Sequence, residues 1–194
     1  LREDHDGVEL AVHLLTGRAG VFAEMGVPAT GTYSEPAQFQ TVLEQLTTAG
    51  CDLLAAPSVR TRQFQRAEIS IASSFSYVKQ FDVRVAQPSG TLIADPVVGV
   101  IEEGLFIRLR NLALPGGSIG LTFDVENVEV LRPVRTESVR VAAGVETTGE
   151  VSFPAVMRAR LFGDVRLGDG ATAFFVTPWK EDRDLALFLS VDKP

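Results

Sequence analysis

The sequence of 194 residues is poor in side chains that build metal and redox sites, with one cysteine and two histidines. A single cysteine excludes a disulfide within the chain and a cysteine-based zinc site. Cys51 follows a predicted helix, where a cysteine is more often a small core residue than a reactive thiol. His5 lies between Asp4 and Asp6, a pattern more typical of a flexible acidic terminus than of a metal site. The sequence predicts no metal and no cofactor.

Positive charge and long apolar runs are also scarce. The 18 basic residues are outnumbered by 25 acidic ones, which gives a net charge of −7. Nucleic acids and anionic membranes are bound through clustered Lys and Arg, and no basic patch is present, so we expect no nucleic-acid partner. No apolar run reaches the roughly 18 residues that a transmembrane helix needs. The polar opening segment 1–6 predicts no signal peptide.

Groups that could carry catalysis are isolated from one another. Ser118 lies in a Gly-Ser-Ile-Gly segment, which lacks the Gly-x-Ser-x-Gly turn of many hydrolases. Glu102 and Glu103 are neighbours on a predicted strand, so they point to opposite faces and cannot act together as acid and base. We therefore predict no catalytic residues and a protein that is not an enzyme.

What the chain has is alternation of apolar and polar residues, which predicts a mainly β fold with antiparallel strands and one short helix. Asp169 and Gly170 form a typical hairpin turn, and Pro115 opens another at residues 115–118. A short strand at 20–23 interrupts a glycine-rich loop over 17–33. The other strands are predicted at 7–15, 52–59, 67–72, 75–86, 97–102, 105–111, 119–130, 134–141, 155–167, 171–176 and 184–191.

The predicted helix follows Ser34, a plausible N-cap, and has Pro36 in its first turn, where the missing N–H costs little. Gly50 ends it. Its apolar side chains recur with helical spacing and form one stripe: Phe39, Val42, Leu43 and Leu46.

The hairpin around Pro115 can be followed in more detail. An antiparallel register that keeps the apolar side chains of its two strands on one face brings Arg108 close to Asp124 or Thr122 on the other. One face is then dry and the other charged. The charged face could be solvated, as in a β-sandwich, or line a water-filled pore.

Several segments, taken in order over residues 36–191, resemble the ring-forming β-domain of the secretins, the outer-membrane pores of secretion systems. They are the helix from Pro36, the strand that runs through Pro57, Ala67–Ile71, Phe75–Val78, Glu103–Leu109, Ile119–Val125, Pro154–Arg160, Val165–Thr172 and Leu185–Val191.

As a divergent secretin-like protein, the chain would contribute antiparallel strands to a multi-subunit β-barrel ring. The resemblance implies a secretin-like β-domain over 34–194, with an N-terminal strand and loop over 1–33 that we expect to form a single domain with it. It also implies a homo-oligomeric gated pore or ring scaffold that serves as a conduit for export. The expected partners are further copies of the chain, outer-membrane lipid and other envelope or secretion components. The expected location is the cell envelope, either the outer membrane or the periplasm.

The resemblance also assigns particular positions. The gate would lie between residues 73 and 98, and 132–153 would form a membrane-facing or rim hairpin. Gly104 would permit a strand bend or a close backbone approach. Pro57, Asp169 and Gly170 would be bends or turns. The tip of the gate would be the small, polar, turn-forming group Gln87, Pro88, Ser89 and Gly90.

Two other hypotheses are compatible with the residues. One is a soluble β-sandwich that binds a ligand or another protein. The other is a hydrolase, which has the least support because no catalytic group is placed for it. The mass of the purified particle would distinguish the soluble β-sandwich from a ring.

Overall fold

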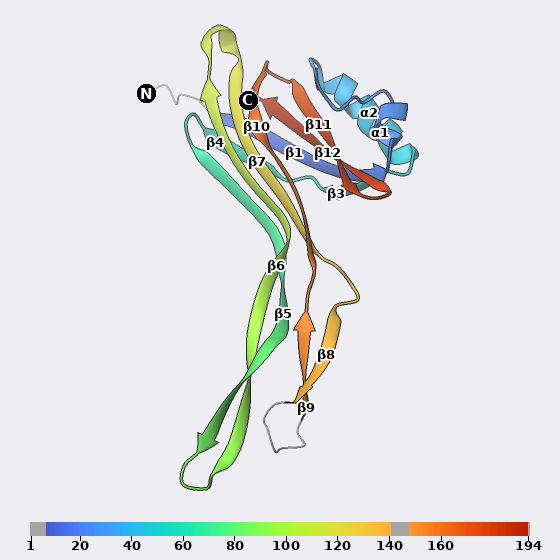
Figure 1. The fold of residues 1–194 in the computed structure, drawn as a ribbon. Coiled ribbons are helices and arrows are strands. Elements are labelled where there is room, and N and C mark those ends of the chain that lie inside the picture. The colour runs from blue at the N-terminus through green and yellow to red at the C-terminus, as the bar shows by residue number, and fades with distance from the viewer. Residues whose placement is uncertain (1–6, 141–147, 194) are drawn as a thin grey trace. The chain divides into compact units, whose positions relative to one another are not determined.

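The computed structural model describes residues 7–140 and 148–193, and strands dominate them (Figure 1). The predicted mainly β, antiparallel fold is confirmed, with 69% strand and 11% helix. The chain divides into two compact units. Unit 1 contains Leu1–Ile69, Phe106–Glu126 and Arg160–Pro194, and unit 2 contains Ser70–Leu105 and Asn127–Ala159. Residues 33 and 34 both belong to unit 1.

A six-stranded sheet forms the centre of unit 1, with strand order β2-β11-β12-β1-β3 and β4 also paired to β1. The pairing of β1 with β12 joins the two ends of the chain, from Glu9 opposite Asp192 to Arg18 opposite Arg183. In β12, residues 185–189 are buried at every position, so both faces of this strand are covered. The strands are β1 (Gly7–Arg18), β2 (Thr30–Tyr33), β3 (Asp52–Ala55), β4 (Ser58–Arg62), β11 (Thr172–Lys180) and β12 (Arg183–Asp192).

Two helices, α1 (Val21–Glu24) and α2 (Pro36–Thr48), cover one face of this sheet (Figure 1). The apolar stripe of α2 packs on a core that includes Phe22, Phe174 and Phe188. Cys51 is buried beside it, as predicted, and burial raises the pKa of its thiol.

Three local predictions in this region were wrong. Residues 20–23 form no strand, because Gly20, at φ +81°, turns the chain into α1. The N-cap of α2 is Glu35 rather than Ser34, and no side chain caps this helix end. The predicted loop also contains β2, which pairs with β11. Helices and strands of four residues are too short to show a period in sequence.

A second sheet has four strands in the order β10-β7-β6-β5. They are β5 (Arg66–Ala86), β6 (Thr91–Ala113), β7 (Ile119–Val130) and β10 (Val156–Leu167), and each has residues in both units. In unit 1 the predicted apolar face is buried, and the ring of Phe123 lies 4.8 Å from that of Phe175 in the first sheet. Strands predicted separately at 67–72 and 75–86 are one continuous strand, as are those at 97–102 and 105–111.

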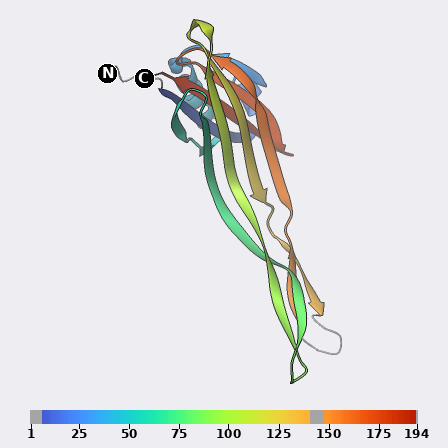
Figure 2. The ribbon, with the colours of Figure 1, turned by 90° about the vertical axis from the view of Figure 1, so that its left-hand side faces the viewer.

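Unit 2 contains the far part of the β5–β6 hairpin and a second hairpin, formed by β8 (Arg135–Arg140) and β9 (Thr148–Phe153) (Figure 2). A hairpin within 132–153 was predicted, although only its first strand was recognised. Residues 141–147 lie outside the described residues. The ring of Phe81 in β5 occupies the place that a Cβ would take at Gly149 in β9, so the two hairpins pack together.

Within residues 7–140 and 148–193, none of the helices has the length and apolar character needed to cross a membrane.

Candidate assembly surface and gate hairpin

The four-stranded sheet ends in two open edges. In its strand order, β5 and β10 are the outer strands and each has one neighbour in this sheet. An outer strand carries unpaired backbone N–H and C=O groups, which can hydrogen-bond to a strand of another chain. Along β10 every second residue from Val156 to Arg166 is exposed. In this strand order neither outer edge of the sheet is paired within the described part of the chain.

Four charged side chains cross the outward face of this sheet in unit 1, one from each strand. We call them the charge row: Glu68 (β5), Arg108 (β6), Asp124 (β7) and Arg160 (β10). Arg160 holds Asp124 with two hydrogen bonds, of 2.7 and 2.9 Å, and Arg108 donates to Asp124 at 3.2 Å. Glu68 lies 4.0 Å from Arg108. The signs alternate from edge to edge.

The charge row tests the register predicted from sequence. Arg108 was predicted to lie near Asp124 or Thr122, and the structure places it on Asp124. Sequence reasoning missed the two outer members, Glu68 and Arg160. Both are exposed residues of their strands, but nothing local to the chain shows that β10 is the neighbour of β7.

Asp124 is the most enclosed member of the charge row, with 22% of its side chain exposed. The hydrogen bonds from Arg160 first, and then those from Arg108, lower the pKa of its carboxyl below the ordinary value. Exposed ion pairs contribute only about 0–1 kcal/mol each to stability. The charge row therefore fixes strand register more than it adds stability.

Acid should weaken the fold through Asp124. Its pKa is lower in the folded than in the unfolded chain, so its stabilising effect is full above the unfolded pKa and is lost as the pH falls. Urea unfolding of the wild type and of Asp124→Asn should give free energies that differ most near neutral pH. The difference should shrink between about pH 5 and pH 2. A difference that is independent of pH would show that this carboxylate is not held in its charged form by the arginines.

The predicted gate corresponds to the hairpin formed by residues 73–98 of β5 and β6, which we call the gate hairpin. Gln87, Pro88, Ser89 and Gly90 form its tip, and Gly90 has the positive φ, +70°, that this turn requires. Next to the tip, Arg84 pairs with Asp95 across the two strands. Four large apolar side chains close to the tip are 38–53% exposed: Val83, Val85, Leu92 and Ile93.

Arg132 connects the gate hairpin to the start of the β8–β9 hairpin within unit 2. Its guanidinium lies 5.5 Å from the centre of the Phe75 ring in β5. The guanidinium also donates hydrogen bonds to both carboxylate oxygens of Glu103 in β6, and the one from Nη1 to Oε2 is 3.0 Å long. The hydrogen bond from Arg132 lowers the pKa of Glu103, and so does the one from the backbone N–H of Val130. The ion pair thus stays formed at neutral pH and ties the two hairpins together.

The remaining predicted positions lie at turns or close approaches. Pro57 lies between β3 and β4, and its carbonyl accepts a hydrogen bond from the N–H of Val12. Asp169 and Gly170 lie in the turn between β10 and β11, where the Asp169 carboxylate accepts a bond from the N–H of Lys193. Gly104 has φ +142°, and a Cβ there would lie 2.2 Å from the carbonyl oxygen of Ile71.

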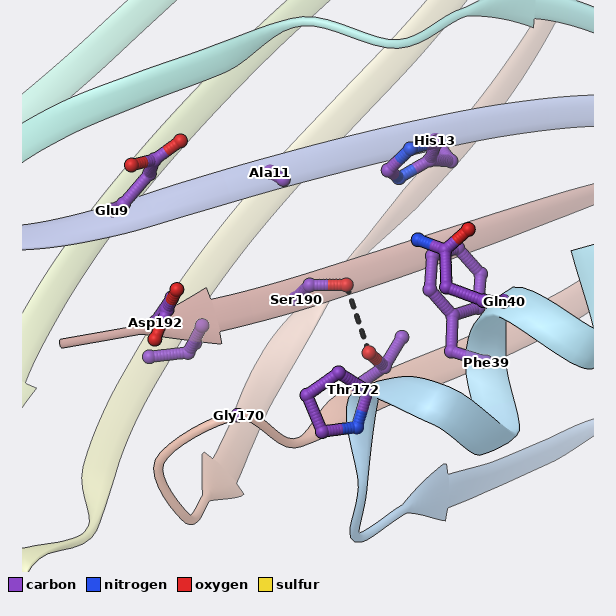
Figure 3. Close-up of a pocket in the computed structure, with 11 residues that line it drawn as sticks. Glu9, Ala11, His13, Phe39, Gln40, Gly170, Thr172, Ser190 and Asp192 are labelled. Atoms are coloured by element: carbon purple, nitrogen blue, oxygen red, sulfur yellow. Dashed lines mark hydrogen bonds between the residues drawn. The ribbon is translucent and has the colours of Figure 1, made fainter. Parts of the chain in front are cut away.

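A pocket of about 190 Å³ opens beside the start of α2 (Figure 3). Ser190 forms a 2.8 Å hydrogen bond with Thr172, so its hydroxyl is bound to a side chain that cannot act as a base. His13 also lines the pocket, and burial lowers its pKa. Its buried Nδ1 has no hydrogen-bond partner in the part of the chain that the structure describes. No Ser–His pair of the kind that activates a nucleophile is recorded here.

Other candidate chemical groups have structural partners. Ser118 accepts a hydrogen bond from Arg166 at 2.7 Å in the β6–β7 turn, where Pro115–Gly117 form one turn of 3-10 helix. Residues 7–140 and 148–193 contain no group of three His, Cys, Asp or Glu side chains placed to hold a metal ion. His5, Asp4 and Asp6 lie outside the described residues.

No family model matches the sequence, and no curated protein matches it. Solved structures do, three of them at 11–12% identity. The secretin InvG of the Salmonella SPI-1 type III secretion injectisome is 11% identical, with a TM-score of 0.47, over 96% of this chain and 63% of that one. A model of the Salmonella SPI-1 type III secretion injectisome basal body proteins InvG, PrgH and PrgK is also 11% identical, with a TM-score of 0.47. That match covers 96% of this chain and 45% of that one.

A third structure, the InvG secretin domain β-barrel from the Salmonella SPI-1 injectisome, is 12% identical, with a TM-score of 0.41, over 96% of this chain and 60% of that one. The chain thus spans less than two thirds of each of these three chains. All three structures contain a secretin, the family that the order of segments in this sequence resembles.

Proposed function

We propose that the protein is a secretin-like subunit that assembles with identical copies into a closed ring. The observation that carries this proposal is the pair of open edges, β5 and β10, on one four-stranded sheet. Cross-strand contacts follow antiparallel registers, as in Arg108 with Asp124 and Ser118 with Arg166. Four strands of alternating direction leave outer strands that run opposite ways. The β10 edge of one copy can then pair with the β5 edge of the next in antiparallel fashion.

Ring closure solves a problem that a single copy leaves open. Exposed sheet edges promote aggregation, and a ring in which every edge is paired has none. The two edges differ in sequence, so the contact is head-to-tail, which produces a ring when the rotation closes. The wholly buried core of unit 1 does not depend on neighbours. Assembly therefore joins subunits that are already folded, through their four-stranded sheets.

In this ring the protein acts as a gated conduit or scaffold of the cell envelope and has no catalytic role. The gate hairpin, with its exposed apolar side chains beside a polar tip, is the element that closes the lumen. Export cargo passes when the gate hairpins move. The partners are further copies of this chain, lipid of the outer membrane and other envelope or secretion components.

Particle mass tests the assembly. The purified chain in mild detergent should give particles of many times 20.9 kDa by mass photometry, and rings in negative stain. Edge pairing depends on concentration, so dilution should shift the population to single chains. A chain that stays at 20.9 kDa at high concentration would refute the ring and favour the soluble β-sandwich.

A further inference from the structure

The charge row ends in opposite charges at the two open edges, Glu68 on β5 and Arg160 on β10. From the structure we infer that Arg160 of one copy pairs with Glu68 of the next, so that the row continues from copy to copy and fixes their register. This inference rests on the proposed ring, and it adds which residues face one another. Both side chains are more than half exposed, at 56% and 59%. Within its own copy Glu68 pairs with Arg66 at 2.6 Å and Arg160 with Asp124, so the contact between copies would extend these pairs.

Residues opposite one another on paired strands have Cβ atoms about 4.5–5.5 Å apart, within reach of an Arg–Glu ion pair. Directly opposed strands would repeat the spacing seen within the sheet, where Arg160 faces Asp124 and Arg108 faces Glu68. Every carboxylate in the row would then lie between two arginines. A ring would contain one unbroken row of alternating charge.

Shifts of the register by two residues lose this match. A shift in one direction places Arg160 opposite Arg66 of the next copy, and like charges directly opposed are destabilising. A shift in the other direction places Arg160 opposite Ser70 and leaves Glu68 opposite Phe162. A shift by one residue would put the buried and outward faces of the neighbouring sheets on opposite sides. The register that pairs Arg160 with Glu68 avoids all three mismatches.

A second observation, the exposure of Phe162, agrees with this register. Phe162 and Phe64 are the two most exposed large apolar side chains in the described part of the chain, at 73% and 63%. Phe162 lies two residues after Arg160 on one edge, and Phe64 lies just before β5 on the other. In the inferred register Phe162 faces Arg66 of the next copy. Arginine is a good partner for an exposed aromatic ring.

Cysteine cross-linking tests the register. The variant carries Glu68→Cys and Arg160→Cys, with Cys51→Ala to remove the native thiol. Within one chain the two sites are three strands apart, roughly 14 Å, so they cannot form a disulfide internally. Mild oxidation of assembled particles should give a ladder of covalent multimers on a non-reducing gel. Two matched variants combine Glu68→Cys with Arg158→Cys or with Phe162→Cys and should cross-link much less.

Because the double variant removes both charges, assembly is also measured with a mixture of two single variants. One chain carries Glu68→Cys and the other carries Arg160→Cys, and oxidation should yield a covalent dimer. Mass photometry before oxidation separates the two proposals. Wild-type chains that form no large particle refute the ring. Rings that cross-link through residue 158 or 162, or that do not cross-link through residues 68 and 160 at all, refute the register. They leave the ring proposal intact.

Discussion

Replacing Gly104 with alanine should reduce the free energy of unfolding by roughly 2–3 kcal/mol. Gly104 has φ +142°, a backbone conformation that residues with a Cβ rarely adopt. Its Cβ would also lie 2.2 Å from the carbonyl oxygen of Ile71 and 2.6 Å from Cα of Ala72. These are backbone atoms of β5, so they cannot move aside by a change of rotamer. The strands β5 and β6 would have to separate locally.

Gly168→Ala is the matched control, because it makes the same chemical change where no atom lies within 4 Å of the added Cβ and φ is not positive. Its effect should stay within about 0.5 kcal/mol. Urea unfolding of both variants, followed by circular dichroism, gives the comparison. Equal stabilities for the two variants would mean that β5 and β6 do not approach closely at Gly104.

The sequence predicted what depends on neighbours close along the chain. The hairpin at Pro115 closes within a few residues, so face matching alone limited the neighbours of Arg108 to Asp124 or Thr122, and Asp124 is its partner. The stripe of α2 was long enough to show a helical period. Cys51 was expected in the core and lies there.

Contacts between distant segments could not be predicted in this way. The pairing of β1 with β12 joins residues more than 160 positions apart, and no local pattern specifies it. Ser73 and Ser74 were left between two predicted strands, yet β5 continues through them because a β-ladder bonds through the backbone. Arg132 was unrecognised for the same reason, since its partners Glu103 and Phe75 lie on other strands.

Shortening the tip of the gate hairpin should make the assembled ring leak. The variant replaces Gln87–Gly90 with the two-residue turn Asn-Gly, which suits a tight hairpin. Ion conductance of the rings in planar bilayers should rise above that of the wild type, while particle mass stays the same. The tip belongs to unit 2, and the charge row at the inferred contact belongs to unit 1, so the change removes no charge-row contact.

A variant of unchanged length separates the size of the tip from its sequence. Ser-Gly-Asn-Gly in place of Gln87–Gly90 keeps four small or polar residues, and its rings should conduct as the wild type does. Closure by tips that meet in the lumen depends on their reach, so losing two residues should matter and replacing four should not. Wild-type conductance after shortening would remove this segment from the gate. Loss of the particles themselves would show that the hairpin supports assembly instead.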